Sequence, residues 1–173
     1  MVMIHLLTGS THTGKTLLAQ RLLERHGAPY LSIDHLKMGL IRSGMCPLTP
    51  ESTDEALTAV LWPVVREIVK TAVENGQSLT VEGCYIPFNW REDFDASCLP
   101  HIRFLCLVFS EAYIRTRFDT IQTHANAIER RKDDSFCTME LLLAENRRNL
   151  EACRRRGLPY YLIDGPYAPP LDW

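Results

Sequence analysis

The stretch that decides the predicted fold is Gly9-Ser10-Thr11-His12-Thr13-Gly14-Lys15-Thr16. Two glycines that flank four residues and are followed by Lys and Thr form the P-loop pattern. Glycine reaches backbone angles that other residues avoid, so successive N–H groups can curl inward around phosphate oxygens at the start of a helix. Lys15 would add a positive charge for the β- and γ-phosphates. Thr16 would offer a hydroxyl to Mg²⁺, which prefers hard oxygen ligands.

The residues on either side of this stretch have the pattern that a P-loop needs. Residues 2–7 form an apolar run typical of a buried strand, and residues 17–26 have helical periodicity that ends at Gly27. Strand, loop and helix therefore follow in the required order, and we expect residues 9–16 to bind the phosphates of ATP. We expect the His12 side chain to point outward without a chemical role. A surface turn rich in glycine and threonine is the alternative that a motif match leaves open.

Two acidic residues follow predicted strands. Residues 28–33 read as a strand that ends at Asp34, and residues 77–81 read as a strand that leads into Glu82 and Gly83. In an open parallel sheet the ligand-binding groups come from the carboxyl ends of strands. We therefore expect Asp34 to orient or deprotonate the phosphoryl acceptor and Glu82 to hold Mg²⁺ through its waters, although either acid could be the base. The alternatives are a helix cap for Asp34 and a surface acid for Glu82.

The rest of the chain alternates between helical and strand-like patterns. This alternation predicts an α/β domain spanning 1–173, in which helices cover both faces of a five-stranded parallel sheet. The further helices are expected at 35–42, at 49–76 from Thr49, from Ser110 to about residue 128 and from Thr138, and the further strands at 101–109 and 160–164.

Composition limits the class of protein. With 173 residues and 46% hydrophobic content, the chain can bury one α/β core. A net charge of −2 gives no general attraction to nucleic acid or to an anionic membrane, so we expect neither as a partner. The six cysteines include no C-x-x-C pair, which is typical of free thiols in a reducing compartment. We expect no signal peptide, and because the sequence has no apolar run of membrane-spanning length we expect a cytoplasmic protein.

The motifs together resemble a known family. With the P-loop, Asp34, Glu82-Gly83 and the run Arg131-Lys132-Asp133-Asp134, the chain resembles the adenylate-kinase-like P-loop kinases of small molecules over nearly its whole length. This resemblance implies the strand order 2-3-1-4-5. An Asp-x-x-Arg/Lys element touches the phosphoryl acceptor in that family, and Asp34 with Lys37 is similar to it. A weaker likeness, through Ser32 to Lys37 with Glu82-Gly83 and Pro87, is to 2-phosphoglycerate-kinase-type sequences.

The resemblance also implies roles for arginines. Arg117 matches the arginine that stacks on adenine, and Arg131 matches the one that clamps the transferring phosphates at the end of a mobile lid. The lid would span about 117–137 and be short and mostly helical, because no glycine occurs between Gly83 and Gly157. For both arginines the alternative is a solvated helix face.

The expected activity is transfer of the γ-phosphoryl group of Mg·ATP to a small acceptor such as a nucleotide, a nucleoside or a phosphorylated metabolite. Lys37, Arg42 and Arg91 would bind anionic groups of the acceptor. Replacement of Lys15 or of Arg131 by alanine should each abolish most of the catalysis. The alternatives are a nucleotide-binding sensor or switch without transfer activity, a kinase of nucleic-acid ends, and a toxin-like kinase. The oligomeric state stays open.

Overall fold

The computed structural model describes residues 2–124 and 136–173. Its five strands form one parallel sheet in the order β2-β3-β1-β4-β5, which confirms the predicted order. The strands are β1 (Ile4–Gly9), β2 (Tyr30–Ser32), β3 (Leu79–Glu82), β4 (Ile102–Phe109) and β5 (Tyr160–Ile163). The helices are α1 (Lys15–His26), α2 (Ile33–Arg42), α3 (Asp54–Glu74), α4 (Glu111–His124) and α5 (Met139–Arg156), with 3-10 turns η1 (Trp90–Asp93) and η2 (Leu99–His101).

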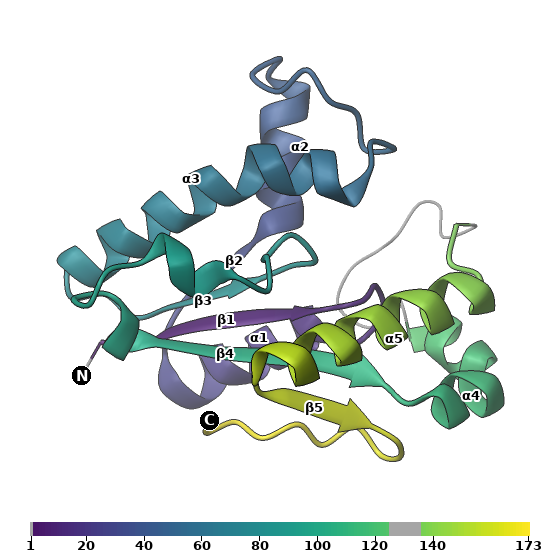
Figure 1. Ribbon diagram of the computed structural model, residues 1–173. Helices are drawn as coiled ribbons and strands as arrows, with labels where there is room; N and C mark the ends of the chain where they lie inside the picture. The colour runs from purple at the N-terminus through teal and green to yellow at the C-terminus, as the bar shows by residue number, and fades with distance from the viewer. Residues whose placement is uncertain (1, 125–135) are drawn as a thin grey trace.

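Alternate residues of the central strand β1 point to opposite faces of the sheet, as the twofold period of a strand requires. Leu6 belongs to the buried cluster that contains Val65 of α3. Leu7 belongs to a second cluster, which contains Leu18 of α1. The sheet is therefore covered on both faces, and Figure 1 shows α1 behind the sheet while α5 crosses in front of it.

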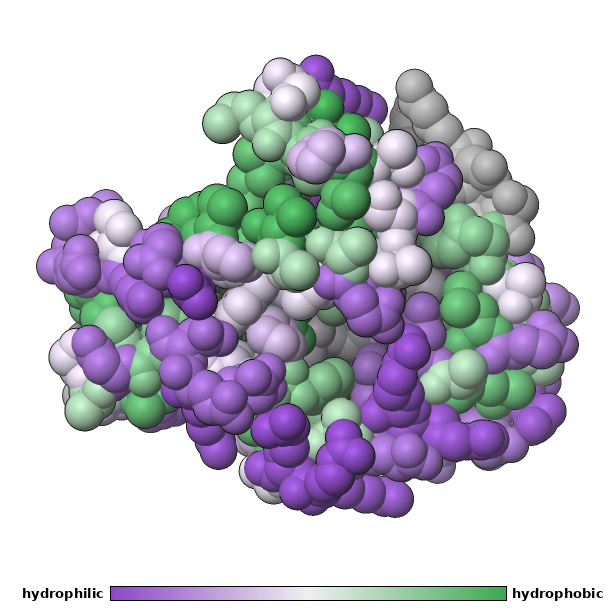
Figure 2. Space-filling model, turned by 45° about the horizontal axis from the view of Figure 1, so that its top comes forward, coloured by the Kyte–Doolittle hydropathy of each residue, from purple (hydrophilic) through white to green (hydrophobic). Residues whose placement is uncertain are grey.

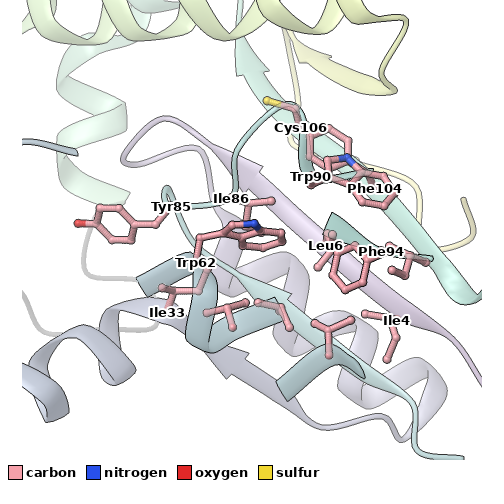
Figure 3. Packing of buried hydrophobic residues seen from close by; sticks show 14 of the residues in the cluster. Ile4, Leu6, Ile33, Trp62, Tyr85, Ile86, Trp90, Phe94, Phe104 and Cys106 are labelled. Carbon is pink, nitrogen blue, oxygen red and sulfur yellow. The ribbon is translucent and has the colours of Figure 1, made fainter. Parts of the chain in front are cut away.

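The first cluster contains a group of packed aromatic rings (Figure 3). The Trp90 ring stacks on Phe104 with 5.9 Å between ring centroids, and Phe94 packs edge-on against Trp90. Such aromatic pairs add about 0.5–1.5 kcal/mol each beyond the burial of their area. Figure 3 shows the Tyr85 hydroxyl pointing away from this cluster. The irregular segment after β3 is thus fixed on its apolar side and keeps a polar group for other contacts.

The second strand is shorter than the sequence predicts. β2 ends at Ser32 and α2 begins at Ile33, so Asp34 lies in the first turn of a helix and not at the end of a strand. Ser32 is the N-cap residue, so the alternative role of Asp34 as the helix cap is wrong. The prediction missed this boundary because the apolar run continues through Ile33, which is buried as the first residue of α2.

The helix expected from Thr49 begins at Asp54 instead. The hydroxyl of Thr53 accepts a hydrogen bond of 3.3 Å from the N–H of Ala56, which is the normal N-cap contact. Asp54 and Glu55 lie in the first turn, where their negative charges interact favourably with the positive end of the helix dipole. The residues from Thr49 to Ser52, where the sequence predicts the helix to begin, form a turn instead.

Figure 2 shows hydrophobic residues gathered over the part of the molecule that α2 and α3 form. Among the described residues, no helix has the combination of length and apolar character that crossing a membrane requires.

His5 on β1 is buried against aromatic rings. Its ring lies 5.0 Å from that of Trp173 and 6.2 Å from that of His26, measured between centroids. Burial, followed by the nearby charges of His26 and Arg103, lowers the pKa of His5 from 6.5 to about 4. His5 is therefore neutral in the folded protein at neutral pH.

We expect this histidine to make folding stability depend on pH. The folded pKa lies below the unfolded one, so the unfolded chain binds more protons at pH values between the two. The contribution of neutral His5 to the free energy of unfolding is fully present above pH 6.5 and is lost as the pH falls towards 4. It amounts to about 3 kcal/mol at most. Urea unfolding at pH 7 and pH 4.5 should show a smaller loss in His5→Phe than in the wild type. Equal losses in both proteins would contradict the assignment.

Candidate active site

The two glycines of the P-loop occupy positions that only glycine fits. Gly9 has φ +145°, and a Cβ there would lie 2.4 Å from the carbonyl oxygen of Leu107 and 2.8 Å from Oγ1 of Thr13. Gly14 has φ +79°, in the left-handed region, and is the N-cap residue of α1. The Thr13 hydroxyl closes the turn by donating a hydrogen bond of 2.8 Å to the carbonyl of Ser10. The backbone thus has the conformation that the motif predicts.

The loop also contains an unusual backbone angle. His12 has φ +67°, and it is the only residue other than glycine with positive φ in the described parts of the chain. Its ring contacts the Thr11 hydroxyl, with 2.8 Å between Nδ1 and Oγ1. Peptides that turn through left-handed conformations form concave nests of N–H groups for anions, so this angle fits a phosphate-binding loop.

Lys15 is the first residue of α1 and folds back over the loop. It is 7% exposed, and its Nζ donates a hydrogen bond of 2.8 Å to the carbonyl of Ser10. A buried ammonium group is stable only where polar or negative partners surround it. The loop therefore holds a positive charge at the N-terminus of a helix, where phosphates bind.

Thr16 and Glu82 meet beside the loop. The Thr16 hydroxyl donates to Oε1 of Glu82 at 3.3 Å, and Glu82 is 2% exposed at the end of β3. Strand β3 pairs with β1, which places Glu82 next to Leu7, two residues before the loop. In the described ranges no group of three or more His, Cys, Asp or Glu side chains could hold a metal. A hydroxyl and a carboxylate are hard oxygen ligands of the kind that Mg²⁺ prefers, and Mg²⁺ takes few protein ligands when phosphates share its shell.

Asp34, Lys37 and Tyr85 form a second polar group. The Lys37 ammonium lies 2.7 Å from Oδ1 of Asp34 and 2.9 Å from the Tyr85 hydroxyl. Burial alone would lower the pKa of Lys37, but the Asp34 carboxylate and the two hydrogen bonds outweigh it and raise the pKa above its usual range. Burial raises the pKa of Tyr85 to about 12 against the opposing effect of Lys37. At neutral pH, Lys37 is therefore charged and Tyr85 is neutral.

The Asp34 carboxylate stays open to solvent. Its side chain is 45% exposed, whereas that of Lys37 is 13% exposed. β2 pairs with β3 so that Ser32 lies opposite Glu82, and Asp34 follows two residues later. The structure thus brings Asp34 to the same edge of the sheet as Glu82, with a buried cation fixing one of its oxygens.

A cavity of about 480 Å³ lies at the ends of β4 and β5. Arg117 lines it, at a point where the backbone of α4 departs from helical geometry (φ −129°, ψ 20°). The opposite wall is the loop at 164–166. The next residue, Tyr167, donates a hydrogen bond of 2.6 Å to the carbonyl of Gly14, so the cavity adjoins the P-loop.

A larger cavity, about 740 Å³, lies where the chain enters β2 and β3, at the end of the sheet opposite the P-loop.

Two predicted site residues are not brought into this group. Arg42 is exposed at the last position of α2, about 12 Å along the helix axis from Asp34 at about 1.5 Å per residue. Arg91 is also exposed, and its guanidinium lies over the Trp90 ring, 5.4 Å from the centroid. Arg131 lies outside the described residues, as does most of the predicted lid. Their roles stay predictions.

Two residues that contact the P-loop, Glu145 and Tyr167, belong to none of the sequence motifs. The Ser10 hydroxyl donates a hydrogen bond of 2.5 Å to Oε2 of Glu145, which lies on α5. Tyr167 lies in the tail after β5. Both contact loop residues that are more than a hundred positions away in the sequence. Neither the spacing nor the residue type distinguishes Glu145 from an ordinary surface acid or Tyr167 from an ordinary packed aromatic residue.

No family model and no curated protein sequence matches the chain. Solved structures do resemble it. A gluconokinase from Sinorhizobium meliloti is 20% identical and has a TM-score of 0.54 over 98% of this chain and 85% of its own. A sugar kinase from Janibacter is 17% identical and has a TM-score of 0.54 over 94% and 85%.

A protein from Chloroflexus aurantiacus is 20% identical to the chain and has a TM-score of 0.59 over 99% of it and 93% of its own length. These likenesses extend over nearly the whole chain, and they agree with the strand order and with the glycine-dependent loop after β1. The chain therefore has the fold of the adenylate-kinase-like P-loop kinases of small molecules.

Proposed function

We propose that this protein is a kinase that uses Mg·ATP to phosphorylate a hydroxyl group of a small molecule. The observation that carries the proposal is the contact between Thr16 and the buried Glu82 beside the P-loop. A hydroxyl and a carboxylate at this position suit Mg²⁺ that is bound to nucleotide phosphates. Asp34, at the same edge of the sheet, adds the carboxylate that a hydroxyl acceptor needs.

Each residue has a task in this proposal. The loop N–H groups and Lys15 hold the phosphates and neutralise their charge, which is the main requirement of phosphoryl transfer. Thr16 and Glu82 would hold Mg²⁺, which supplies further charge neutralisation on the phosphate oxygens. Asp34 accepts the proton of the acceptor hydroxyl as its oxygen forms a bond to the γ-phosphorus. The bond from that phosphorus to the bridging oxygen breaks at the same time, and ADP leaves.

The nucleotide base would lie in the cavity between Arg117 and the loop at 164–166. A guanidinium stacks well on an aromatic ring, and the cavity adjoins the P-loop through Tyr167. The break in α4 at Arg117 supports this assignment, because it changes the direction of the backbone at the residue that lines the cavity.

For the acceptor we propose a sugar, a sugar acid or a polyol. Lys37 already pairs with Asp34 and Tyr85, so it is poorly placed to bind the phosphate group of an acceptor. Asp34 instead keeps an exposed carboxylate for a hydroxyl group. The names of two fold neighbours, a gluconokinase and a sugar kinase, point to the same class of acceptor.

A two-stage screen tests the proposal. The non-hydrolysable analogue AMP-PNP with Mg²⁺ should first raise the melting temperature, because it binds the folded state. The protein is then incubated with γ-labelled ATP and a panel of sugars, sugar acids, polyols, nucleosides, nucleotides and phosphorylated metabolites. We expect label in a hydroxylated, non-phosphorylated acceptor. Label in a nucleotide would overturn the acceptor class, and nucleotide binding with no transfer to any compound would favour the sensor.

A further inference from the structure

The chain after β5 runs back along α1. Near the start of the helix, the Tyr167 hydroxyl donates to the carbonyl of Gly14, and the Arg21 guanidinium lies 5.3 Å from the centroid of the Tyr167 ring. At the other end, Nε2 of His26 lies 3.1 Å from the carbonyl oxygen of Leu171. Figure 1 shows this tail returning from β5 towards the opposite end of the sheet. The tail is thus fixed to α1 at both ends of the helix.

Tyr167 contacts the P-loop closely. A Cβ on Gly14 would lie 2.8 Å from three atoms of the Tyr167 side chain, so the ring fills the space that any other residue at this position would need. The carbonyl of Gly14 also accepts the first hydrogen bond of α1, from the N–H of Leu18 at 3.0 Å. Both acceptor positions of this carbonyl are therefore used, one by the helix and one by the tail.

The peptide that these two bonds hold is the one between Gly14 and Lys15. A peptide unit is planar, so fixing its carbonyl also fixes the direction of the Lys15 N–H on the other side. This N–H is at the N-terminus of α1, where N–H groups bind phosphate. Burial raises the pKa of Tyr167, despite the opposing charge of Arg21, so its hydroxyl remains a donor at neutral pH.

We propose that Tyr167 is a positioning residue for the nucleotide phosphates, acting through the Gly14–Lys15 peptide. The inference rests on the proposed nucleotide site. It gives the tail a function beyond packing: Tyr167 directly follows the residues that line the cavity beside Arg117, so one short segment contacts both the proposed base site and the P-loop.

The test uses Tyr167→Phe, which keeps the ring and removes only the hydroxyl. The matched control is Tyr161→Phe, a partly buried tyrosine of the same hydrophobic cluster. Calorimetric titrations with Mg²⁺ and either ATP or inorganic tripolyphosphate should show affinities about tenfold lower for Tyr167→Phe, because one hydrogen bond is lost. Adenosine should bind the variant and the wild type equally, and the control should resemble the wild type with all three ligands.

The readouts separate positioning from a general effect on folding. A loss that is the same for adenosine and tripolyphosphate would show that Tyr167 only supports the structure, and would overturn the inference. Equal affinity of the wild type and Tyr167→Phe for ATP would overturn it as well, while leaving the proposed kinase intact. Failure of the wild-type protein to bind ATP would overturn both.

Discussion

Replacing Lys15 with alanine is expected to lower kcat/KM by about 10³-fold or more, because the ammonium group neutralises phosphate charge that builds up during transfer. The group is buried and hydrogen-bonded to the loop, so a water molecule in its place cannot supply the charge. Steady-state kinetics with the acceptor found in the screen measure the loss, and titration with AMP-PNP shows how much of it comes from nucleotide binding.

Lys70→Ala is the matched control for this experiment. Lys70 lies on α3 and pairs with Glu67 at 2.9 Å, away from the P-loop, and such surface pairs contribute about 0–1 kcal/mol. Circular dichroism and thermal unfolding of both variants show whether the fold survives. Wild-type turnover in Lys15→Ala would remove the basis of the proposed chemistry.

The P-loop pattern carried most of the fold prediction, for a physical reason. Gly9 and Gly14 occupy positions where a side chain would collide with neighbouring atoms, so the residue type reports directly on the backbone. The alternation of strand and helix patterns along the chain predicts a parallel sheet. The family resemblance supplies the strand order that the structure confirms. The boundaries around Asp34 and Asp54 were less predictable, because caps and apolar runs compete over a few residues there.

Some residues that the sequence predicts to act together also contact each other in the structure, and their roles stay predictions. Thr16 with Glu82 and Asp34 with Lys37 each lie together in the structure. Tyr167 could not be found this way, since its contact with the P-loop depends on the path of the tail after the last strand. The position of the Arg91 guanidinium over the Trp90 ring could not be predicted either, because it results from the packing of the segment after β3.

Asp34→Asn is the second change with a large expected effect. The substitution keeps the shape of the side chain and removes the carboxylate that would accept the acceptor's proton, so kcat should fall by about 10²–10⁴-fold. The affinity for AMP-PNP should stay unchanged, because Asp34 pairs with Lys37 and not with the P-loop. Rapid-quench measurements of a single turnover isolate the chemical step from product release.

Asp34→Asn also leaves Lys37 without its negative partner, and the loss of activity could then come from an uncompensated ammonium group that is 13% exposed. The double variant Asp34→Asn/Lys37→Met separates the two causes. If Asp34 is the base, the double variant stays as inactive as the single one, although its stability recovers. If activity recovers as well, Asp34 serves only to neutralise Lys37, and the buried carboxylate of Glu82 becomes the remaining candidate for the base. Glu82→Gln would then lose the chemical step at saturating Mg²⁺, whereas a residue that only holds the metal would mainly raise the Mg²⁺ concentration needed for half-maximal activity.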